Sequence, residues 1–284
     1  MTYHKIIFGD SRRMTELADN SCHLMVTSPP YFNAPFDYKD HFPSYNDFLE
    51  LIRDFANETY RVLDKGRIAC INCDDMLVNG QKYPVVADVT RLFIEAGFRY
   101  RDKIIWRKPE GYIRISRRSG VMLQHPYPMY FYPDNIQESI LIFQKGHFDY
   151  SKVDRGIKEA SRIDKDEFQG NKWFLSVWDM VNRLPFLNKG NDNYPAAFPE
   201  ELPYRIVKLF SYKCELVLDP FLGSGTTTKI CMQLGRNSIG YEIDKTLEAL
   251  IKRKLGIAQP KLQLGESDVI EFVYRERKQA KISV

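Results

Sequence analysis

The sequence lacks the features that mark membrane, secreted and disulfide-rich proteins. No apolar run in its 284 residues reaches the roughly 18 to 20 residues that a membrane span requires. Met1 to Asp10 has neither the basic start nor the apolar core of a signal peptide. The five cysteines are an odd, scattered set, which argues against a disulfide framework. These absences predict a soluble, cytoplasmic globular protein with no membrane partner.

Two cysteines have the spacing of half a zinc site. Cys70 and Cys73 are separated by two residues, but they lie within and just after an apolar, strand-like run, and no second pair accompanies them. We therefore expect structural cysteines and no metal. The net charge of +4 is too small to indicate a partner, so the distribution of charge carries more information.

Short apolar runs alternate with amphipathic helical patterns along most of the chain. This arrangement predicts an α/β fold with a mainly parallel twisted sheet and helices on both faces. The expected strands are 22–28, 67–72, 103–106, 139–143, 215–219 and 238–242. The expected helices are 45–63, 84–96 and 226–234. Residues 107–184 have few clean periods, so we predict an insertion there, between a first half of the α/β domain at 1–106 and a second half at 185–284.

The stretch LVLDPFLGSGTT, residues 216–227, has the pattern of a nucleotide-type ligand site. A buried strand ending in Asp219 precedes Gly223, Gly225 and a helix, and glycines let a ligand approach the backbone. The phosphate-binding GxxxxGK[ST] pattern is absent. Glu242 ends the next expected strand, where a carboxylate can accept hydrogen bonds from a ribose diol. The pattern favours a nucleoside ligand without a pyrophosphate, although a simple tight turn would also use these glycines.

The stretch LMVTSPPYFN, residues 24–33, places a stiff corner at the end of another buried strand. Pro29 and Pro30 lack a backbone N–H and fix φ near −65°, so the turn presents carbonyl oxygens and no donors. A rigid exposed turn with a packing tyrosine is the simpler reading of SPPY in isolation.

TSPPY followed much later by DPFLGSGTT resembles the DNA amino-methyltransferases, which methylate an exocyclic nitrogen with S-adenosyl-L-methionine. The order of the two motifs is similar to that of the beta class. The resemblance implies the S-adenosylmethionine-dependent methyltransferase (Rossmann-like) fold, with target recognition in the insertion. It also implies that Asp10 reaches the adenine and that Phe198 and Pro199 enclose the methionine end. The predicted cofactor-binding residues are Asp10, Thr27, Phe198, Pro199, Asp219, Phe221, Gly223, Gly225, Thr226 and Glu242.

The chemistry of an exocyclic amine explains the SPPY corner. The lone pair of the amine is delocalised into the ring, so acceptors aimed at its N–H groups assist as the methyl group arrives. Ser28 Oγ and the Pro29 carbonyl can accept these bonds and stabilise the developing positive charge, and Tyr31 can stack on a flipped base. The predicted catalytic residues are Ser28, Pro29, Pro30 and Tyr31. No cysteine follows a proline, which argues against the covalent cytosine-C5 mechanism.

Residues 99–118 contain eight Lys or Arg and two acidic residues, interleaved with aromatics. This is the footprint of phosphate contacts with some stacking, although a charge run can also be a solvated face. The candidate DNA-binding residues are Arg107, Lys108, Arg114, Arg117 and Arg118.

The sequence thus favours a site-specific methyltransferase acting on cytosine N4 in double-stranded DNA, because a serine heads the tetrapeptide as in the cytosine-N4 enzymes. Alternatives are an adenine-N6 enzyme on the same scaffold, an RNA methyltransferase and a noncatalytic nucleoside-binding module. A cognate restriction endonuclease is left open as a further partner.

Overall fold

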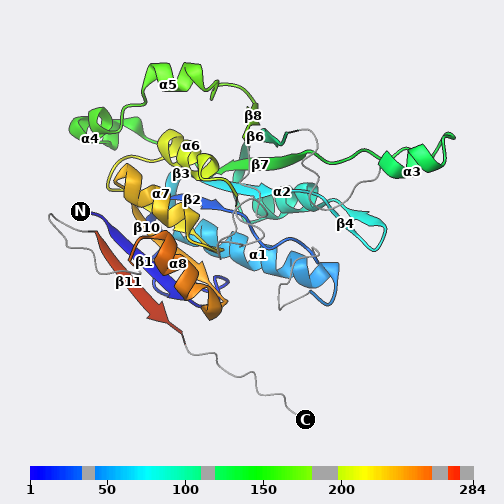
Figure 1. The fold of residues 1–284 in the computed structure, drawn as a ribbon. Coiled ribbons are helices and arrows are strands. Elements are labelled where there is room, and N and C mark those ends of the chain that lie inside the picture. Colours follow the sequence, from blue (N-terminus) through cyan, green and yellow to red (C-terminus); the bar gives the residue numbers. More distant parts are fainter. Residues whose placement is uncertain (34–41, 110–118, 181–197, 258–267, 276–284) are drawn as a thin grey trace, which may run out of the picture.

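The computed structural model describes residues 1–33, 42–109, 119–180, 198–257 and 268–275, and the structural statements below concern this part of the chain. Its centre is a nine-stranded sheet in the order β11-β1-β10-β9-β2-β3-β7-β6-β8 (Figure 1). The strands are β1 (Tyr3–Phe8), β2 (Cys22–Thr27), β3 (Leu63–Cys73), β6 (Arg99–Arg107), β7 (Gln137–Gln144), β8 (Val177–Asp179), β9 (Leu216–Asp219), β10 (Asn237–Glu242) and β11 (Val269–Tyr274). Only β7 of these strands runs antiparallel to its neighbours, so the predicted mainly parallel α/β fold is confirmed.

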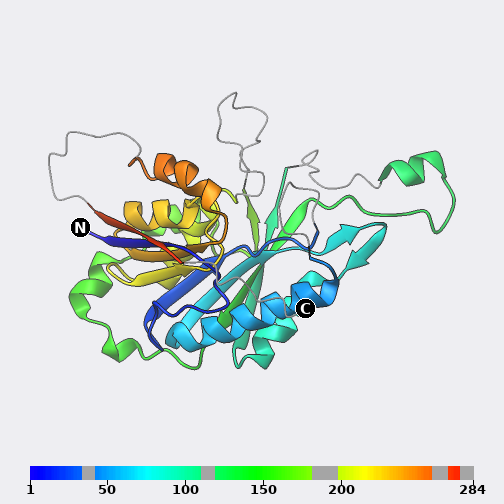
Figure 2. The same cartoon turned by 90° about the horizontal axis from the view of Figure 1, so that it is seen from below.

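Helices cover both faces of the sheet (Figure 2). One face carries α1 (Tyr45–Val62) and α2 (Val85–Glu95), and the other carries α6 (Glu201–Phe210), α7 (Thr226–Leu234) and α8 (Glu248–Lys254). Ser44 caps α1 by accepting a bond from the Asp47 N–H, which satisfies one of the free donors at the helix start. Gly235 ends α7 at a φ of 69°, the left-handed conformation that glycine adopts without strain.

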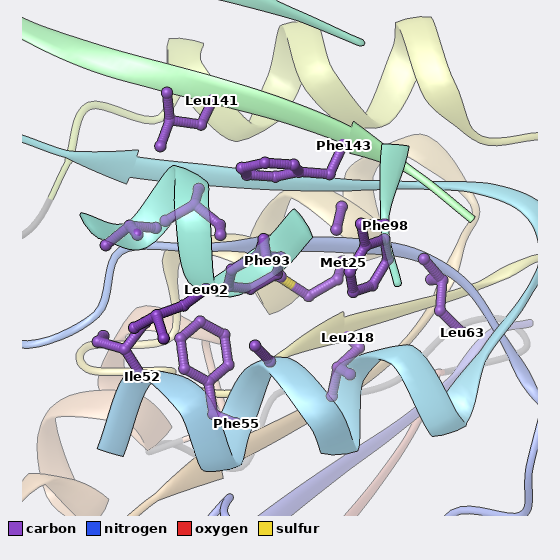
Figure 3. Packing of buried hydrophobic residues seen from close by; sticks show 14 of the residues in the cluster. Met25, Ile52, Phe55, Leu63, Leu92, Phe93, Phe98, Leu141, Phe143 and Leu218 are labelled. Carbon is purple, nitrogen blue, oxygen red and sulfur yellow. The ribbon is translucent and has the colours of Figure 1, made fainter. Parts of the chain in front are cut away.

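The larger core lies between the sheet and the helices α1 and α2. Phe93 of α2 is fully buried, and its ring centroid lies 5.2 Å from that of Phe55, 5.3 Å from that of Phe98 and 4.8 Å from that of Phe143 (Figure 3). A second cluster packs α6 and α7 on the opposite face, and a third lies under α8. Burying apolar area on both faces favours near-continuous apolar strands, which is the pattern seen in the sequence.

The expected strands and helices are all present, with differences at their ends. Strand β3 begins at Leu63, four residues before the expected start at residue 67. Strand β6 begins at Arg99, earlier than the apolar residues that predicted it. The sequence reading assigned no strand to β1, β8, β11 or to the hairpin of β4 (Met76–Val78) and β5 (Gln81–Tyr83). The sheet-edge strands β8 and β11 and the hairpin are short or half-exposed, so their patterns are weak.

The range 107–184, predicted as an insertion, also contributes a strand to the central sheet. Strand β7 lies within this range and pairs with both β3 and β6, because its apolar residues belong to the core. Two stretches leave the body around β7. The first contains α3 (Ser119–Gln124), at the end of an arm extending away from the sheet (Figures 1 and 2). The second contains α4 (Arg155–Ala160), α5 (Lys165–Gly170) and the edge strand β8.

Cys70 and Cys73 both lie buried in strand β3. Residues three apart in a strand point to opposite faces, and these two pack in the two clusters on opposite sides of the sheet. Their spacing therefore does not form half a metal site. No helix among the described residues is both long enough and apolar enough to cross a membrane.

Candidate functional site

The carboxyl ends of β1, β10, β9, β2 and β3 meet at one edge of the sheet, because these neighbouring strands are parallel. Residues at the ends of these strands are therefore brought together although they are far apart in the chain. This edge holds Asp10 after β1, Glu242 in β10, Asp219 in β9 and Ser28 after β2. In open α/β sheets, this edge is where ligands bind.

Asp219 is the most enclosed acidic group at this edge, with 2% of its surface exposed. Its carboxylate accepts hydrogen bonds from Thr27 Oγ1 at 2.7 Å, from Thr227 Oγ1 at 2.6 Å and from the Phe221 N–H at 3.1 Å. Burial raises the pKa of Asp219 to about 6, and the hydrogen bonds from the two threonines and Phe221 limit that rise. The sequence reading missed Thr227, although a threonine one position into the helix is within reach of the strand end.

Glu242 holds the glycine loop through backbone hydrogen bonds. One carboxylate oxygen accepts from the Gly223 N–H and the other from the Asp244 N–H, each at 2.8 Å. Gly223 and Gly225 have φ values of 55° and 86°, in the left-handed region that favours glycine. Burial raises the pKa of Glu242 to about 7, although the two backbone bonds oppose this shift. Glu242 is therefore a structural partner of the loop as well as a candidate ligand acceptor.

A lysine that the sequence reading missed also reaches the loop. Lys254 of α8 donates to Ser224 Oγ and to Thr226 Oγ1, each at 2.6 Å, and both acceptor residues are buried. The predicted cofactor residue Thr226 thus presents its hydroxyl to Lys254. No sequence signal distinguishes Lys254 from the other basic residues of α8.

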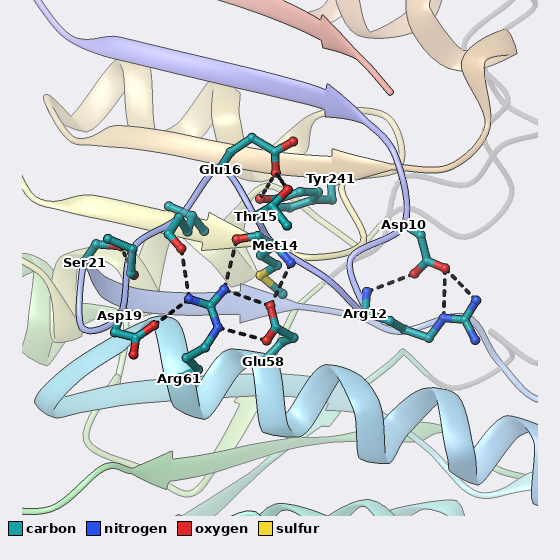
Figure 4. Close-up of polar contacts among 12 residues, drawn as sticks. Asp10, Arg12, Met14, Thr15, Glu16, Asp19, Ser21, Glu58, Arg61 and Tyr241 are labelled. Carbon is teal, nitrogen blue, oxygen red and sulfur yellow. Dashed lines mark hydrogen bonds and ion pairs between the residues drawn. The ribbon is translucent and has the colours of Figure 1, made fainter. Parts of the chain in front are cut away.

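Asp10 lies beside Glu242, because Phe8 pairs with Glu242 and the Gly9 N–H donates to the Glu242 carbonyl at 2.8 Å. Arg12 binds the Asp10 carboxylate through its backbone N–H and side chain, at 2.6 to 2.9 Å (Figure 4). Burial alone would raise the pKa of Asp10, but the bonds from Arg12 outweigh it and lower that pKa. The carboxylate is thus ionised and oriented next to Glu242.

The predicted cofactor-binding residues Phe221 and Phe198 pack on opposite faces of the sheet. Phe221 packs on the α1 side, with its ring centroid 5.1 Å from that of Phe55. Phe198 packs with the α6 and α7 cluster on the other side, and Pro199 is buried just before α6.

The SPPY corner follows β2 directly. Pro29 is buried, and Ser28, Pro30 and Tyr31 are half-buried. The Tyr31 hydroxyl donates to Glu138 Oε2 at 2.8 Å and also hydrogen-bonds Ser28. Burial, followed by the negative charge of Glu138, raises the pKa of Tyr31 well above its usual value, so the hydroxyl is a protonated donor. Glu138 was not singled out from the sequence.

The predicted DNA-contacting residues differ in their placement. Arg107 is exposed and forms an ion pair with Asp179, with Nε 2.6 Å from Oδ1. Lys108, the first residue after β6, is 8% exposed, and its ammonium group pairs with the buried Glu138 carboxylate. This geometry does not favour a phosphate contact by Lys108. Arg114, Arg117 and Arg118 lie outside the described residues.

Comparison with known proteins gives relatives over nearly the full chain. The N6_N4_Mtase family model, described as DNA methylase, matches residues 22–253. The Type II methyltransferase M.MjaI of Methanocaldococcus jannaschii is 36% identical, with 96% of this chain and 97% of the relative covered. The Type II methyltransferase M.MthZI of Methanothermobacter thermautotrophicus is 33% identical, with coverages of 96% and 83%.

A solved structure extends this similarity to the fold. TTHA0409 of Thermus thermophilus, named as a candidate DNA modification methylase and solved with S-adenosyl-L-methionine, is 28% identical to this chain. The TM-score is 0.73, and the match covers 95% of this chain and 98% of the neighbour. The family match, the two relatives and the shared fold agree with one another. The chain therefore belongs to the DNA methylase family of N6 and N4 amino-methyltransferases.

Proposed function

We propose that this protein is a site-specific DNA methyltransferase that transfers a methyl group directly to the exocyclic N4 of a flipped cytosine, with S-adenosyl-L-methionine as the donor. One observation carries the proposal. Thr27, the last residue of β2, bonds Asp219 at 2.7 Å, and the next residue is Ser28 of the SPPY corner. The candidate acceptor site for the amine and the candidate cofactor loop are thus joined by a single hydrogen bond.

The residues at the glycine loop fit the proposed cofactor. Gly223 and Gly225 adopt positive φ values without strain, which allows the tight loop between β9 and α7 that a cofactor would lie against. Glu242 and Asp10 offer carboxylates at the ends of adjacent strands, suited to the hydroxyl groups of a ribose and the amine of an adenine. When bound there, S-adenosyl-L-methionine supplies an electrophilic sulfonium methyl group.

The SPPY corner supplies the acceptors for the amine. Ser28 Oγ and the Pro29 carbonyl accept from its two N–H groups, which favours the rehybridised amine as positive charge develops. Tyr31 provides a ring against which the flipped base stacks. In one in-line step, the bond from N4 to the methyl group would form as the methyl–sulfonium bond breaks, and the amine would then lose a proton to water; pre-alignment of the amine with the methyl group lowers the barrier to this step.

The choice of cytosine rests on Ser28. Serine in the first position of the tetrapeptide resembles the cytosine-N4 enzymes, whereas aspartate or asparagine is usual in the adenine enzymes. Adenine N6 is the second candidate, because the family that contains this chain includes both types.

Double-stranded DNA is the proposed substrate, bound by residues of the range 107–184. The arm between β6 and β7 leaves from the same edge as the SPPY corner and carries exposed apolar side chains, with Tyr127 65%, Met129 92% and Phe131 71% exposed. Such side chains can wedge between bases, and neighbouring basic residues can hold phosphates. We also propose that the protein acts in the cytoplasm, with a cognate restriction endonuclease as a further partner.

The test is to identify the methylated nucleoside. Unmethylated DNA is incubated with the protein and tritiated S-adenosyl-L-methionine, then hydrolysed to nucleosides that are separated and counted. Label in N4-methylcytosine is the expected result. Label in N6-methyladenine alone would refute the cytosine assignment, and unlabelled DNA would refute the proposed activity.

A further inference from the structure

Behind Tyr31 lies a buried polar cluster, the Tyr31 anchor, formed by Asn72, Lys108 and Glu138. Each of the three comes from a different strand end. Asn72 lies near the carboxyl end of β3, Lys108 follows β6, and Glu138 lies at the start of β7. Strand β7 is antiparallel to β3 and β6, so its first residues lie at the same edge as their ends.

The anchor is arranged around the Glu138 carboxylate. Oε2 accepts from the Tyr31 hydroxyl at 2.8 Å and from Asn72 Nδ2 at 2.5 Å, and Oε1 pairs with the Lys108 ammonium group. Lys108 Nζ also lies 5.0 Å from the ring centroid of Trp106. Asn72, Lys108 and Glu138 are 2%, 8% and 7% exposed. Burial of so many polar groups is costly unless they bond one another, and here both oxygens of the Glu138 carboxylate have partners.

The orientation of Asn72 follows from the carboxylate. An amide oxygen turned toward Glu138 Oε2 would be repelled, so the NH₂ group faces Glu138 and Oδ1 points elsewhere. Asn72 Oδ1 is buried and has no hydrogen-bond partner among the described residues. The orientation of Asn72 that serves Glu138 therefore leaves its own amide oxygen unpaired, at a cost in stability.

A purely structural role does not explain the contact with Tyr31. A buried ion pair between Lys108 and Glu138 can often be replaced by apolar residues without loss of stability. Here, however, the same carboxylate binds the hydroxyl of Tyr31, which also hydrogen-bonds Ser28. The cluster thus acts on two residues of the SPPY corner.

We propose that Glu138, held by Lys108 and Asn72, is a positioning residue that fixes the ring of Tyr31 in the orientation needed to stack on the target base. The inference rests on the proposed function, because it assigns Tyr31 to the base. Fixing the hydroxyl restricts rotation of the ring about its side-chain bonds, so less order is lost when the base enters. Without the bond to Glu138, the backbone of Tyr31 stays where it is, but its ring is free to rotate.

The test compares single-turnover methyl transfer to plasmid DNA in wild type, Tyr31→Phe, Glu138→Gln and the double variant, at saturating S-adenosyl-L-methionine. Tyr31→Phe removes only the hydroxyl and leaves the ion pair intact. Each single variant should slow transfer by about 10-fold to 100-fold, the range produced by a small misplacement of reacting groups. The double variant should be about as slow as Tyr31→Phe, because that variant already removes the bond that Glu138→Gln weakens. Cofactor affinity, measured by calorimetry, should change less than about 2-fold.

A matched control exists elsewhere in the chain. Tyr204 donates to Glu167 Oε1 at 2.7 Å, and Glu167 pairs with Lys208, so the same three residue types meet between α5 and α6. Tyr204→Phe removes only that hydroxyl, outside the range proposed to bind DNA, and should leave the single-turnover rate at the wild-type value. Glu138→Gln could fail to fold because Lys108 is left without its buried partner. In that case the double substitution Lys108→Met with Glu138→Gln, which removes both charges, takes the place of Glu138→Gln in the experiment.

The outcomes separate the two proposals. A wild-type protein that labels no DNA would overturn the proposed function and this inference with it. An active wild type with unchanged rates in Tyr31→Phe and Glu138→Gln would overturn the inference alone. Multiplicative losses in the double variant would also overturn it, since they would show that Tyr31 and Glu138 act independently.

Discussion

The affinity for S-adenosyl-L-methionine should depend on pH through Glu242. Burial raises the pKa of this carboxyl from its ordinary value of 4.5 to about 7. The folded protein therefore retains a proton on Glu242 at slightly acidic pH, where a free carboxyl would be ionised. Ribose hydroxyls donate to the ionised form, so binding should weaken as pH falls through about 7 and level off above about 8.

The magnitude follows from the ionised fraction. For a pKa of about 7, that fraction falls from about 0.9 at pH 8 to about 0.1 at pH 6, so Kd should rise by about 10-fold, or about 1.4 kcal/mol. Glu242→Gln should remove this dependence. It should also weaken binding at pH 8 by about 1 to 3 kcal/mol, because an amide cannot accept from both Gly223 and Asp244.

Isothermal titration calorimetry at pH 6, 7 and 8 measures both effects. The amino group of the cofactor itself titrates near 8, but it does so equally with both proteins, so the difference between wild type and Glu242→Gln isolates the carboxyl. Identical pH slopes in the two folded proteins would show that Glu242 is not a cofactor ligand.

Two further predictions concern the core and the DNA interface. Phe93→Ala should lower the free energy of unfolding by about 3 to 5 kcal/mol in urea titrations, because Phe93 is fully buried among three aromatic rings; a loss below about 1 kcal/mol would contradict this packing. Replacing Arg114, Arg117 and Arg118 together by Ala should weaken DNA binding and flatten its salt dependence while cofactor affinity is kept; an unchanged salt slope would mark these arginines as a solvated face.

The sequence predicted the elements whose apolar pattern is strong. The run 22–28 became β2, and the pattern over 45–63 became α1, because both bury a continuous apolar face. Strand β11 was missed because its residues are only half-buried at the sheet edge and no sequence signal indicates that they pair with β1. The order of the strands and the antiparallel direction of β7 depend on tertiary packing, which periodicity does not encode.

The residues of the candidate site also fall into those that the sequence predicts and those that depend on tertiary packing. Asp219 and Glu242 could be predicted because each ends an apolar strand, and strand ends gather at one edge of a parallel sheet. Lys108 could not be separated from the exposed basic residues around it, because burial of a lysine depends on a distant carboxylate. The sequence holds only a weak signal for Glu138: it is a charged residue directly before the apolar run 139–143. In the structure, Glu138 is buried in β7 together with that run.

The anchor and the arm between β6 and β7 share their two ends. Lys108 is the first residue after β6, and Glu138 is the second residue of β7, so the arm begins and ends at this ion pair. The backbone N–H of Lys108 also donates to the Ile136 carbonyl at 2.7 Å. This bond is a second link, beside the ion pair, between the two ends of the arm. The base of the arm therefore lies directly beside Glu138. Because Glu138 holds Tyr31, the part of the chain proposed to recognise DNA is connected through two side chains to the residue proposed to stack on the target base.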